Sequence, residues 1–188
     1  MIISLSGKQG SGKSTIAALL AKTLHATPLH LAETLRDELE AHGMARELMD
    51  TQEGKASIVT WEGRSLTVRE VMCEHGARRY AENPLWLIEG LLAKATDGIY
   101  VVDDVRRKNE AAHLAFFGPV IRIEHYAETE SQEITECDLD DWPYFDFTFY
   151  PAYGELAQVT FHILRALTQL PGVSAEGIYA LSAKLIRT

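Results

Sequence analysis

Residues 7–15 read Gly-Lys-Gln-Gly-Ser-Gly-Lys-Ser-Thr, and this stretch decides the fold. It matches G-x-x-x-x-G-K-[ST], the P-loop pattern of a phosphate-binding loop. Glycine permits backbone conformations that a Cβ would forbid, so consecutive N–H groups can point into one concavity that holds an anion. We therefore expect this loop to bind ATP through Gly7, Gly10, Ser11, Gly12, Lys13, Ser14 and Thr15.

The segments on both sides of the loop support this interpretation. Residues 1–6 form a short apolar run that is typical of a buried strand. After the loop, apolar residues recur at helical spacing, and a helix that begins here directs its free N–H groups and positive dipole end at phosphate. In this arrangement Lys13 reaches the β- and γ-phosphates, and the Ser14 hydroxyl binds Mg²⁺.

A second stretch, residues 99–104, resembles the strand that carries the metal-binding acid in P-loop enzymes. Four residues suited to a buried parallel strand are followed by Asp103 and Asp104. Because ligands bind beyond the carboxyl ends of parallel strands, we expect both carboxylates to face the P-loop. The pattern alone leaves open which acid serves the metal. We take Asp103, with Ser14, as the Mg²⁺ ligand.

The rest of the chain alternates between apolar strands and amphipathic helices. It predicts an α/β protein with the P-loop NTPase fold: a five-stranded parallel sheet flanked by helices on both faces. We expect a single P-loop kinase domain over residues 1–188, with an acceptor-binding region at 44–82. Residues 124–141 hold eight acidic residues and no Lys or Arg, which favours a short lid.

The sequence also predicts individual turns and helix ends. We expect a hairpin turning at Glu62-Gly63, a helix capped by Thr67 and ending at Gly76, a helix starting at Asn83-Pro84, and a final helix from Ser174.

Composition and charge limit the classes of molecule that we expect this protein to bind. The chain of 188 residues has a formal net charge of −9, which argues against a general nucleic-acid or anionic-membrane surface. Cys73 and Cys137 have no metal-site spacing and suit a reducing compartment. With neither a signal peptide nor an apolar run of membrane-spanning length, we expect a cytoplasmic protein that binds neither membrane nor nucleic acid. A homodimer is compatible with these features.

The positive charge that two phosphorylated substrates require must come mainly from the first two thirds of the chain. No Lys or Arg occurs between Arg122 and Arg165. Arg106 lies just after the strand-end acids, and we expect it to bridge the donor and acceptor phosphates. The other candidates for binding the acceptor are Arg36, Arg69, Arg78 and Arg79. For each of these four taken alone, a solvated surface charge is an equally good interpretation.

The chain resembles the phage-type deoxynucleoside monophosphate kinases, within the P-loop nucleoside-monophosphate-kinase-like fold. Besides the P-loop, the sharpest likeness is residues 103–110, which read D-D-V-R-R-K-N-E and match that family's D-D-V-R-x-x-N-E. Residues 31–36 and 67–72 are similar to two further family segments. Two departures are Glu133-Ile134-Thr135-Glu136, where the family usually has His-x-Ser-Glu, and Pro151, where it often has Asn.

The resemblance implies a transferase that moves the γ-phosphoryl of ATP, with Mg²⁺, to a (deoxy)nucleoside monophosphate in deoxynucleotide metabolism. It places Lys13, Asp103, Asp104 and Arg106 in catalysis and Asn109 in substrate binding. A kinase of another small molecule, with dephospho-coenzyme A as leading acceptor, is the first alternative. A regulatory nucleotide-binding switch is the second, although the Asn-Lys-x-Asp motif of GTPases is missing. The base and sugar of the acceptor stay open.

Overall fold

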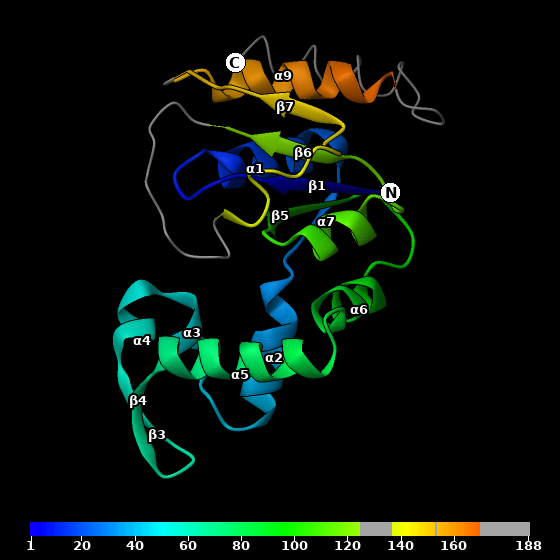
Figure 1. The fold of residues 1–188 in the computed structure, drawn as a ribbon. Helices are drawn as coiled ribbons and strands as arrows, with labels where there is room; N and C mark the ends of the chain where they lie inside the picture. The colour runs from blue at the N-terminus through cyan, green and yellow to red at the C-terminus, as the bar shows by residue number, and fades with distance from the viewer. Residues whose placement is uncertain (125–136, 153, 170–188) are drawn as a thin grey trace. The chain divides into compact units, whose positions relative to one another are not determined.

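The structure is a computed structural model, and it describes residues 1–124, 137–152 and 154–169. The chain divides into two compact units (Figure 1). We call Met1–His30 with Ala95–Thr188 the sheet unit, and Leu31–Lys94 the insert unit. The expected acceptor-binding region, 44–82, lies inside the insert unit.

The sheet unit is built on five parallel strands, as predicted. They are β1 Ile2–Ser6, β2 Thr27–Leu29, β5 Tyr100–Val105, β6 Val120–Ile123 and β7 Phe147–Phe149, in the order β2-β5-β1-β6-β7. β1 is central, and all five of its residues are buried. Because every strand runs the same way, the loops after β1, β2 and β5 all leave the sheet at its carboxyl edge, where ligands bind in such folds.

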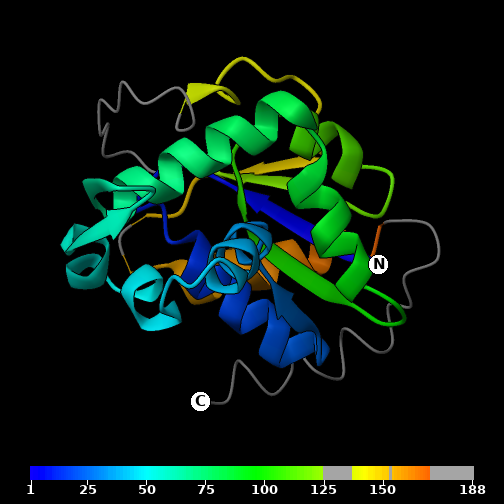
Figure 2. The ribbon, with the colours of Figure 1, turned by 90° about the horizontal axis from the view of Figure 1, so that it is seen from below.

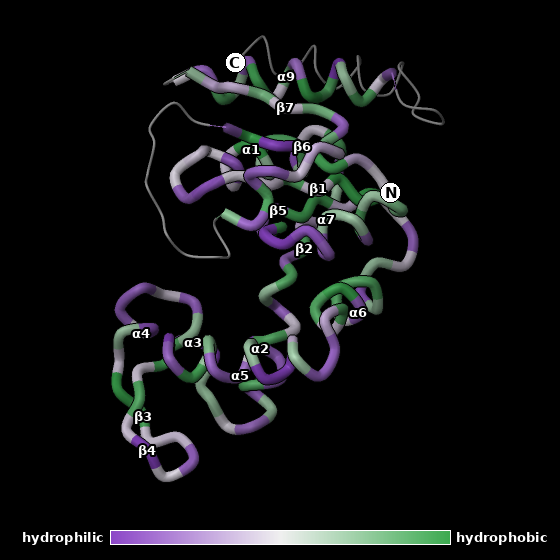
Figure 3. Tube along the Cα trace, viewed as in Figure 1, coloured by the Kyte–Doolittle hydropathy of each residue, from purple (hydrophilic) through white to green (hydrophobic). Residues whose placement is uncertain are grey.

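Helices cover both faces of this sheet, which confirms the predicted architecture (Figure 2). α1 (Lys13–Leu24) and α9 (Leu156–Leu167) pack together on one face. Their apolar sides close a core over Ile3, Leu5 and Val101, and hydrophobic and hydrophilic stretches alternate along α9 (Figure 3). α7 (Lys108–Leu114) contacts β1 from the other face. No helix within the described residues is long and apolar enough to cross a lipid bilayer.

The insert unit has a hydrophobic core of its own, formed by Leu39, Met44, Met49, Val68 and Val71. The two central residues of its hairpin turn, Glu62 and Gly63, both have positive φ, which matches the right-handed twist of the paired strands. The predicted hairpin is therefore confirmed. The elements of this unit are α2 Ala32–Ala41, α3 Arg46–Asp50, α4 Gln52–Ala56, β3 Ile58–Trp61, β4 Arg64–Thr67, α5 Val68–Glu82 and α6 Trp86–Lys94.

The cap predicted at the start of α5 is also confirmed. The Thr67 hydroxyl accepts a hydrogen bond from the Glu70 backbone at 3.2 Å, and the Glu70 carboxylate accepts one from the Thr67 backbone at 2.7 Å. The predicted end at Gly76 is wrong, because α5 continues to Glu82. A glycine within a helix costs about 1 kcal/mol relative to alanine. Here Arg79, one turn further on, is bound by Glu38 of α2, and this contact holds the helix together beyond the glycine.

The next helix begins later than the sequence predicts. α6 starts at Trp86 and not at Pro84. The Asn83 side chain does act as a cap, since its Oδ1 accepts a hydrogen bond from the Leu85 backbone at 2.9 Å. Residues 84 and 85 form a turn that leads into the helix.

Two expectations fall on parts of the chain outside the described residues. Most of the expected lid, residues 125–136, is one, and the final helix expected from Ser174 is the other. Residues 137–141, at the end of the expected lid, are described, and their contacts appear with the site below.

Candidate functional site

The glycines of the loop between β1 and α1 are needed where they stand. Gly10 and Gly12 have φ values of 81° and 84°, in the left-handed region that side chains disfavour. A Cβ on Gly7 would lie 2.4 Å from the Ile123 carbonyl oxygen, and one on Gly12 would lie 2.6 Å from Leu156 Cδ2. The sequence therefore folds into a loop that packs against β6 and α9.

Two polar side chains of the loop fit an anion. The Lys13 ammonium donates a hydrogen bond to the Lys8 carbonyl oxygen at 3.1 Å, so the lysine lies along its own loop. The Ser11 hydroxyl is buried and has no hydrogen-bond partner among the described residues. Such orphaned buried donors are rare in native proteins, and a bound phosphate group would supply the missing partner.

Asp103 joins this loop to the sheet. It lies near the carboxyl end of β5, is 8% exposed, and its carboxylate accepts hydrogen bonds from the Ser14 hydroxyl and from His30 Nδ1, the latter at 2.8 Å. Burial acts to raise the pKa of Asp103. The hydrogen bonds from His30 and Ser14, together with the charge of Lys13, outweigh burial and hold the pKa below its usual range.

The donor atoms around Asp103 fit a divalent cation. The Ser14 hydroxyl and the Asp103 and Asp104 carboxylates are oxygen donors, the type that Mg²⁺ prefers. One oxygen of each aspartate and one nitrogen of His30 lie within 4.8 Å of one another. The chain therefore has residues that would hold Mg²⁺ beside the P-loop.

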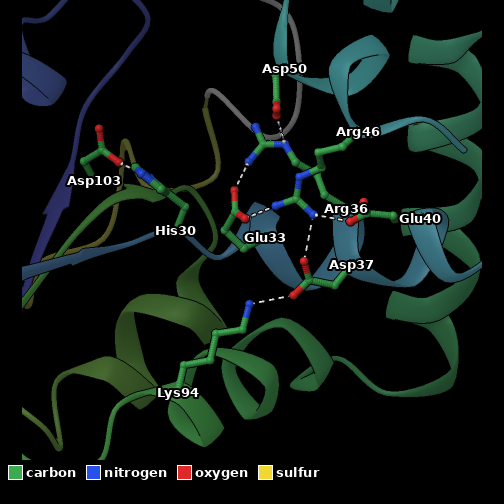
Figure 4. A network of polar contacts seen from close by, with 9 residues as sticks. All are labelled: His30, Glu33, Arg36, Asp37, Glu40, Arg46, Asp50, Lys94 and Asp103. Atoms are coloured by element: carbon green, nitrogen blue, oxygen red, sulfur yellow. Dashed lines mark hydrogen bonds and ion pairs between the residues drawn. The ribbon is translucent and has the colours of Figure 1, made fainter.

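Sequence reasoning missed His30. This residue follows β2, and β2 pairs with β5, so the strand order brings the imidazole to Asp103 (Figure 4). No local pattern marks the histidine. The usable signal is its position at the end of a strand, because strand ends in a parallel sheet meet at one edge.

Glu110 determines the shape of the loop that carries Arg106. Its carboxylate accepts hydrogen bonds from the backbone N–H groups of Arg106 and Arg107 at 2.9 and 3.0 Å. Burial raises the pKa of Glu110 to about 7, with a further contribution from the nearby Asp104 carboxylate that is opposed by the two hydrogen bonds. The Arg106 side chain is exposed at the start of this loop, and Asn109 follows in α7.

The acidic residues Asp138 and Asp140 hold the P-loop and α7, a role that the sequence did not suggest. Asp140 pairs with Lys8 of the P-loop at 2.9 Å and with the buried Arg122 of β6 at 2.7 Å. Asp138 accepts a hydrogen bond from the Lys108 backbone at 2.8 Å, at the start of α7. These carboxylates thus tie together two of the segments that carry predicted site residues.

Arg36 belongs to a polar network within the insert unit (Figure 4). Its guanidinium donates to Glu33 at 2.5 Å and lies 3.5 Å from Asp50. Arg46 bonds the same Glu33 and also Asp37 and Glu40, and Asp37 pairs with Lys94. A phosphate that binds Arg36 must therefore compete with carboxylates already in place.

The other three predicted arginines lie on α5. Arg69 donates to Gln52 at 2.6 Å, while Arg79 bonds Glu38 and Glu82 and lies over the Trp86 ring at 5.5 Å. Arg78 is half-exposed, 3.6 Å from Glu62, and donates to His75 at 3.1 Å. Of the three, Arg78 lines a cavity of about 140 Å³ within the insert unit, together with Trp61, Glu62, Val71, Glu74 and His75.

The structure thus places the predicted residues in two groups. The sheet unit holds the P-loop residues and also Asp103, Asp104, Arg106 and Asn109. Within it, the hydrogen bond between Ser14 and Asp103 joins the loop to β5. Arg36, Arg69, Arg78 and Arg79 belong to the insert unit.

Comparison with known proteins adds a likeness in structure. No family model and no curated protein matches the sequence. Among solved structures, shikimate kinase from Aquifex aeolicus matches 92% of this chain and 100% of its own, with a TM-score of 0.58 and 14% identity. Shikimate kinase from Bacteroides thetaiotaomicron matches 100% of this chain and 97% of its own, with a TM-score of 0.33 and 14% identity. The first of these likenesses concerns architecture, and with the sheet order and the loop geometry it shows that this chain has the P-loop NTPase fold, as in shikimate kinase.

Proposed function

We propose that this protein is an ATP-dependent phosphotransferase that moves the γ-phosphoryl group to a (deoxy)nucleoside monophosphate. The observation that carries this proposal is the hydrogen bond between the P-loop hydroxyl of Ser14 and the Asp103 carboxylate at the end of β5. This pairing puts an oxygen donor from each of the two predicted motifs at one place. P-loop enzymes hold the metal of their nucleotide with such a pair.

The reaction requires positioning and charge neutralisation more than covalent chemistry. An oxygen of the acceptor phosphate attacks the γ-phosphorus, and the bond from that phosphorus to the β–γ bridging oxygen breaks. ADP then leaves with the electron pair. The P-loop amides and Lys13 hold the β- and γ-phosphates, and Arg106 stabilises the charge of the transferring group with its planar guanidinium. Ser14 and Asp103 would hold Mg²⁺, which would supply positive charge to neutralise the phosphate oxygens.

Two features support a nucleoside monophosphate as acceptor. The segment from Asp103 to Glu110 matches the D-D-V-R-x-x-N-E pattern of the phage-type deoxynucleoside monophosphate kinases. In the insert unit, the cavity lined by Trp61 and Arg78 offers an aromatic ring, two carboxylates and a guanidinium, groups that suit a nucleobase. We assign this cavity to the base, and Arg36 and Arg69 to the acceptor's phosphate.

An ADP-release assay over a panel of acceptors tests the proposal. The panel holds the ribo- and deoxynucleoside monophosphates, dephospho-coenzyme A and shikimate, each with Mg²⁺ and ATP. We expect turnover with at least one nucleoside monophosphate and only background ADP release with the other two. A Lys13→Ala variant serves as the control for contaminating kinases.

Other outcomes point elsewhere. Turnover confined to dephospho-coenzyme A or shikimate would assign a different small-molecule kinase. Slow ATP hydrolysis without transfer to any acceptor would support a regulatory nucleotide-binding protein. Each of these results would overturn the nucleoside monophosphate assignment.

A further inference from the structure

His30 is a polar side chain at the metal site that the proposed function does not use. Its side chain is 45% exposed, so burial does not explain its position. Its Nδ1 nevertheless lies 2.8 Å from the Asp103 carboxylate, and the ring is directed at that carboxylate (Figure 4). An exposed imidazole that is held against a metal-binding acid is suited to a role at the metal.

The spacing of the donor atoms agrees with shared coordination of one ion. One ring nitrogen of His30 and one oxygen each of Asp103 and Asp104 all lie within 4.8 Å of one another. Two neighbouring ligands of an octahedral ion, each about 2.1 Å from the metal, are about 3 Å apart. The 2.8 Å between His30 Nδ1 and Asp103 Oδ1 is close to this value. Without a metal, the same two atoms share a proton, and a cation can take its place.

We propose that His30 is a third ligand at this site, beside Asp103 and Asp104, and that it makes the site prefer a divalent transition-metal ion to Mg²⁺. The reason is the type of donor. Carboxylates suit Mg²⁺ and Mn²⁺ alike, whereas imidazole nitrogen favours transition metals and contributes little to Mg²⁺ binding. The inference rests on the proposed function only in placing the site's metal beside the P-loop, and it is testable without turnover.

Two experiments on the full-length, nucleotide-free protein at neutral pH test this inference, with Mn²⁺ alone as the probe. The first is titration followed by electron paramagnetic resonance, with Mg²⁺ affinity measured by competition. Mutation of an outer-shell partner of a metal ligand typically costs ten- to a hundredfold in metal affinity, and loss of a ligand itself should cost at least as much. We expect His30→Ala to weaken Mn²⁺ binding by at least about tenfold and to change Mg²⁺ binding by no more than about twofold.

The second experiment is spectroscopic. Electron spin-echo modulation of bound Mn²⁺ detects directly coordinated nitrogen, so the wild type should show a nitrogen signal that changes when the histidines are isotope-labelled. His30→Asn removes the imidazole but keeps a polar side chain, and the signal should disappear in this variant. His162→Ala, at an exposed position of α9, should keep the signal and the Mn²⁺ affinity of the wild type.

The outcomes separate this inference from the proposed function. Mn²⁺ binding without a nitrogen signal, equal weakening of both ions in His30→Ala, or no Mn²⁺ binding in the absence of nucleotide would each overturn it. A protein that phosphorylates a nucleoside monophosphate but shows no nitrogen signal would overturn the His30 ligand alone. A protein with the nitrogen signal and no transfer to any acceptor would overturn the proposed function alone.

Discussion

Under the proposed function, Lys13 is the side chain on which we expect transfer to depend most. Its ammonium lies along the P-loop, bonded to the Lys8 carbonyl oxygen. We expect Lys13→Ala to lower kcat by at least about a hundredfold, because the charge that develops between the β- and γ-phosphates is no longer neutralised. Steady-state assays measure this effect, with circular dichroism to establish that the variant is folded. Retention of a large part of wild-type kcat would contradict the P-loop assignment.

Asp103 and Asp104 are adjacent in sequence but differ in surroundings. Asp103 is buried and bonded to Ser14, whereas Asp104 is half-buried and near Glu110. We therefore expect Asp103→Asn to lower kcat and to shift the Mg²⁺ requirement to higher concentration by about tenfold or more. Asp104→Asn should have the smaller effect on Mg²⁺. The Mg²⁺ dependence of kcat in the two variants checks this, and identical curves would show that Asp103 is not the principal ligand.

Arg106 is exposed on the loop that follows β5. A guanidinium can contact two phosphate oxygens at once in one plane, whereas the ammonium of lysine is a point charge. We expect Arg106→Lys to lower kcat/KM by about tenfold or more even though the charge is kept. Arg69→Lys, which changes a guanidinium of the insert unit in the same way, is the matched comparison and should raise the acceptor KM more than the ATP KM. Near-normal kcat/KM in Arg106→Lys would exclude the bridging role.

The site residues that belong to a sequence motif could be predicted from the sequence, whereas the site residues outside any motif could not. The contact between Ser14 and Asp103 follows from two patterns that both mark the carboxyl edge of the sheet. His30 is brought to this region by the order of the strands in the sheet. Asp140 lies in a segment whose sequence shows only that it is acidic, and not that it contacts the P-loop. Their roles depend on which chain segments become neighbours in space, and no local spacing encodes that.

At the scale of elements, the start of α7 depends on a buried carboxyl group. Glu110 has a pKa raised to about 7 because burial disfavours its charge. An acid with a raised pKa stabilises the fold at low pH and loses this contribution as the pH rises toward the folded-state value. We expect Glu110→Gln to become more stable relative to the wild type as the pH rises from about 5 to about 8, by an amount on the order of 2–3 kcal/mol.

Urea unfolding at several pH values measures this difference. Glu70→Gln is the matched control, because Glu70 bonds the start of α5 in the same way but is exposed and has a lowered pKa. Its difference from the wild type should be constant over the same range, since a lowered pKa acts only at more acidic pH. A flat profile for Glu110→Gln would mean that the carboxyl group is charged in the folded protein.

The elements themselves were largely readable from the sequence. The alternation of apolar strands with amphipathic helices predicted the parallel sheet, and the Thr67–Glu70 pair predicted the start of α5. The predicted end at Gly76 failed because one glycine costs a helix only about 1 kcal/mol, and α5 has contacts with another helix beyond it, such as Arg79 with Glu38. The division into two units was not visible either, since no change in composition marks residues 31 or 94.

At the scale of the whole molecule, the two units differ in how the chain builds them. The insert unit is one continuous stretch, whereas β1 of the sheet unit pairs with strands far along the chain, as in Ile3 with Val101 and Leu5 with Ile121. Contacts that are distant in sequence form slowly because the intervening loop must first be closed. We expect the amides of α2 and α5 to become protected before those of β1 when the full-length chain refolds. Pulse-labelled hydrogen exchange measures this order, and protection of β1 first would contradict it.

The same connectivity determines the order in which the two units can fold while the chain is being synthesised. Once residue 94 has left the ribosome, the insert unit has all its sequence, while β1 and the loop at Gly7 still lack both neighbouring strands. The loop, although translated first, receives the oxygen atoms of Asp103 and the packing surface of Leu156 only when the later strands and α9 arrive. We therefore expect a nascent chain arrested between these points to carry the complete P-loop motif and to bind no nucleotide, so that ATP would not assist the early stages of its folding.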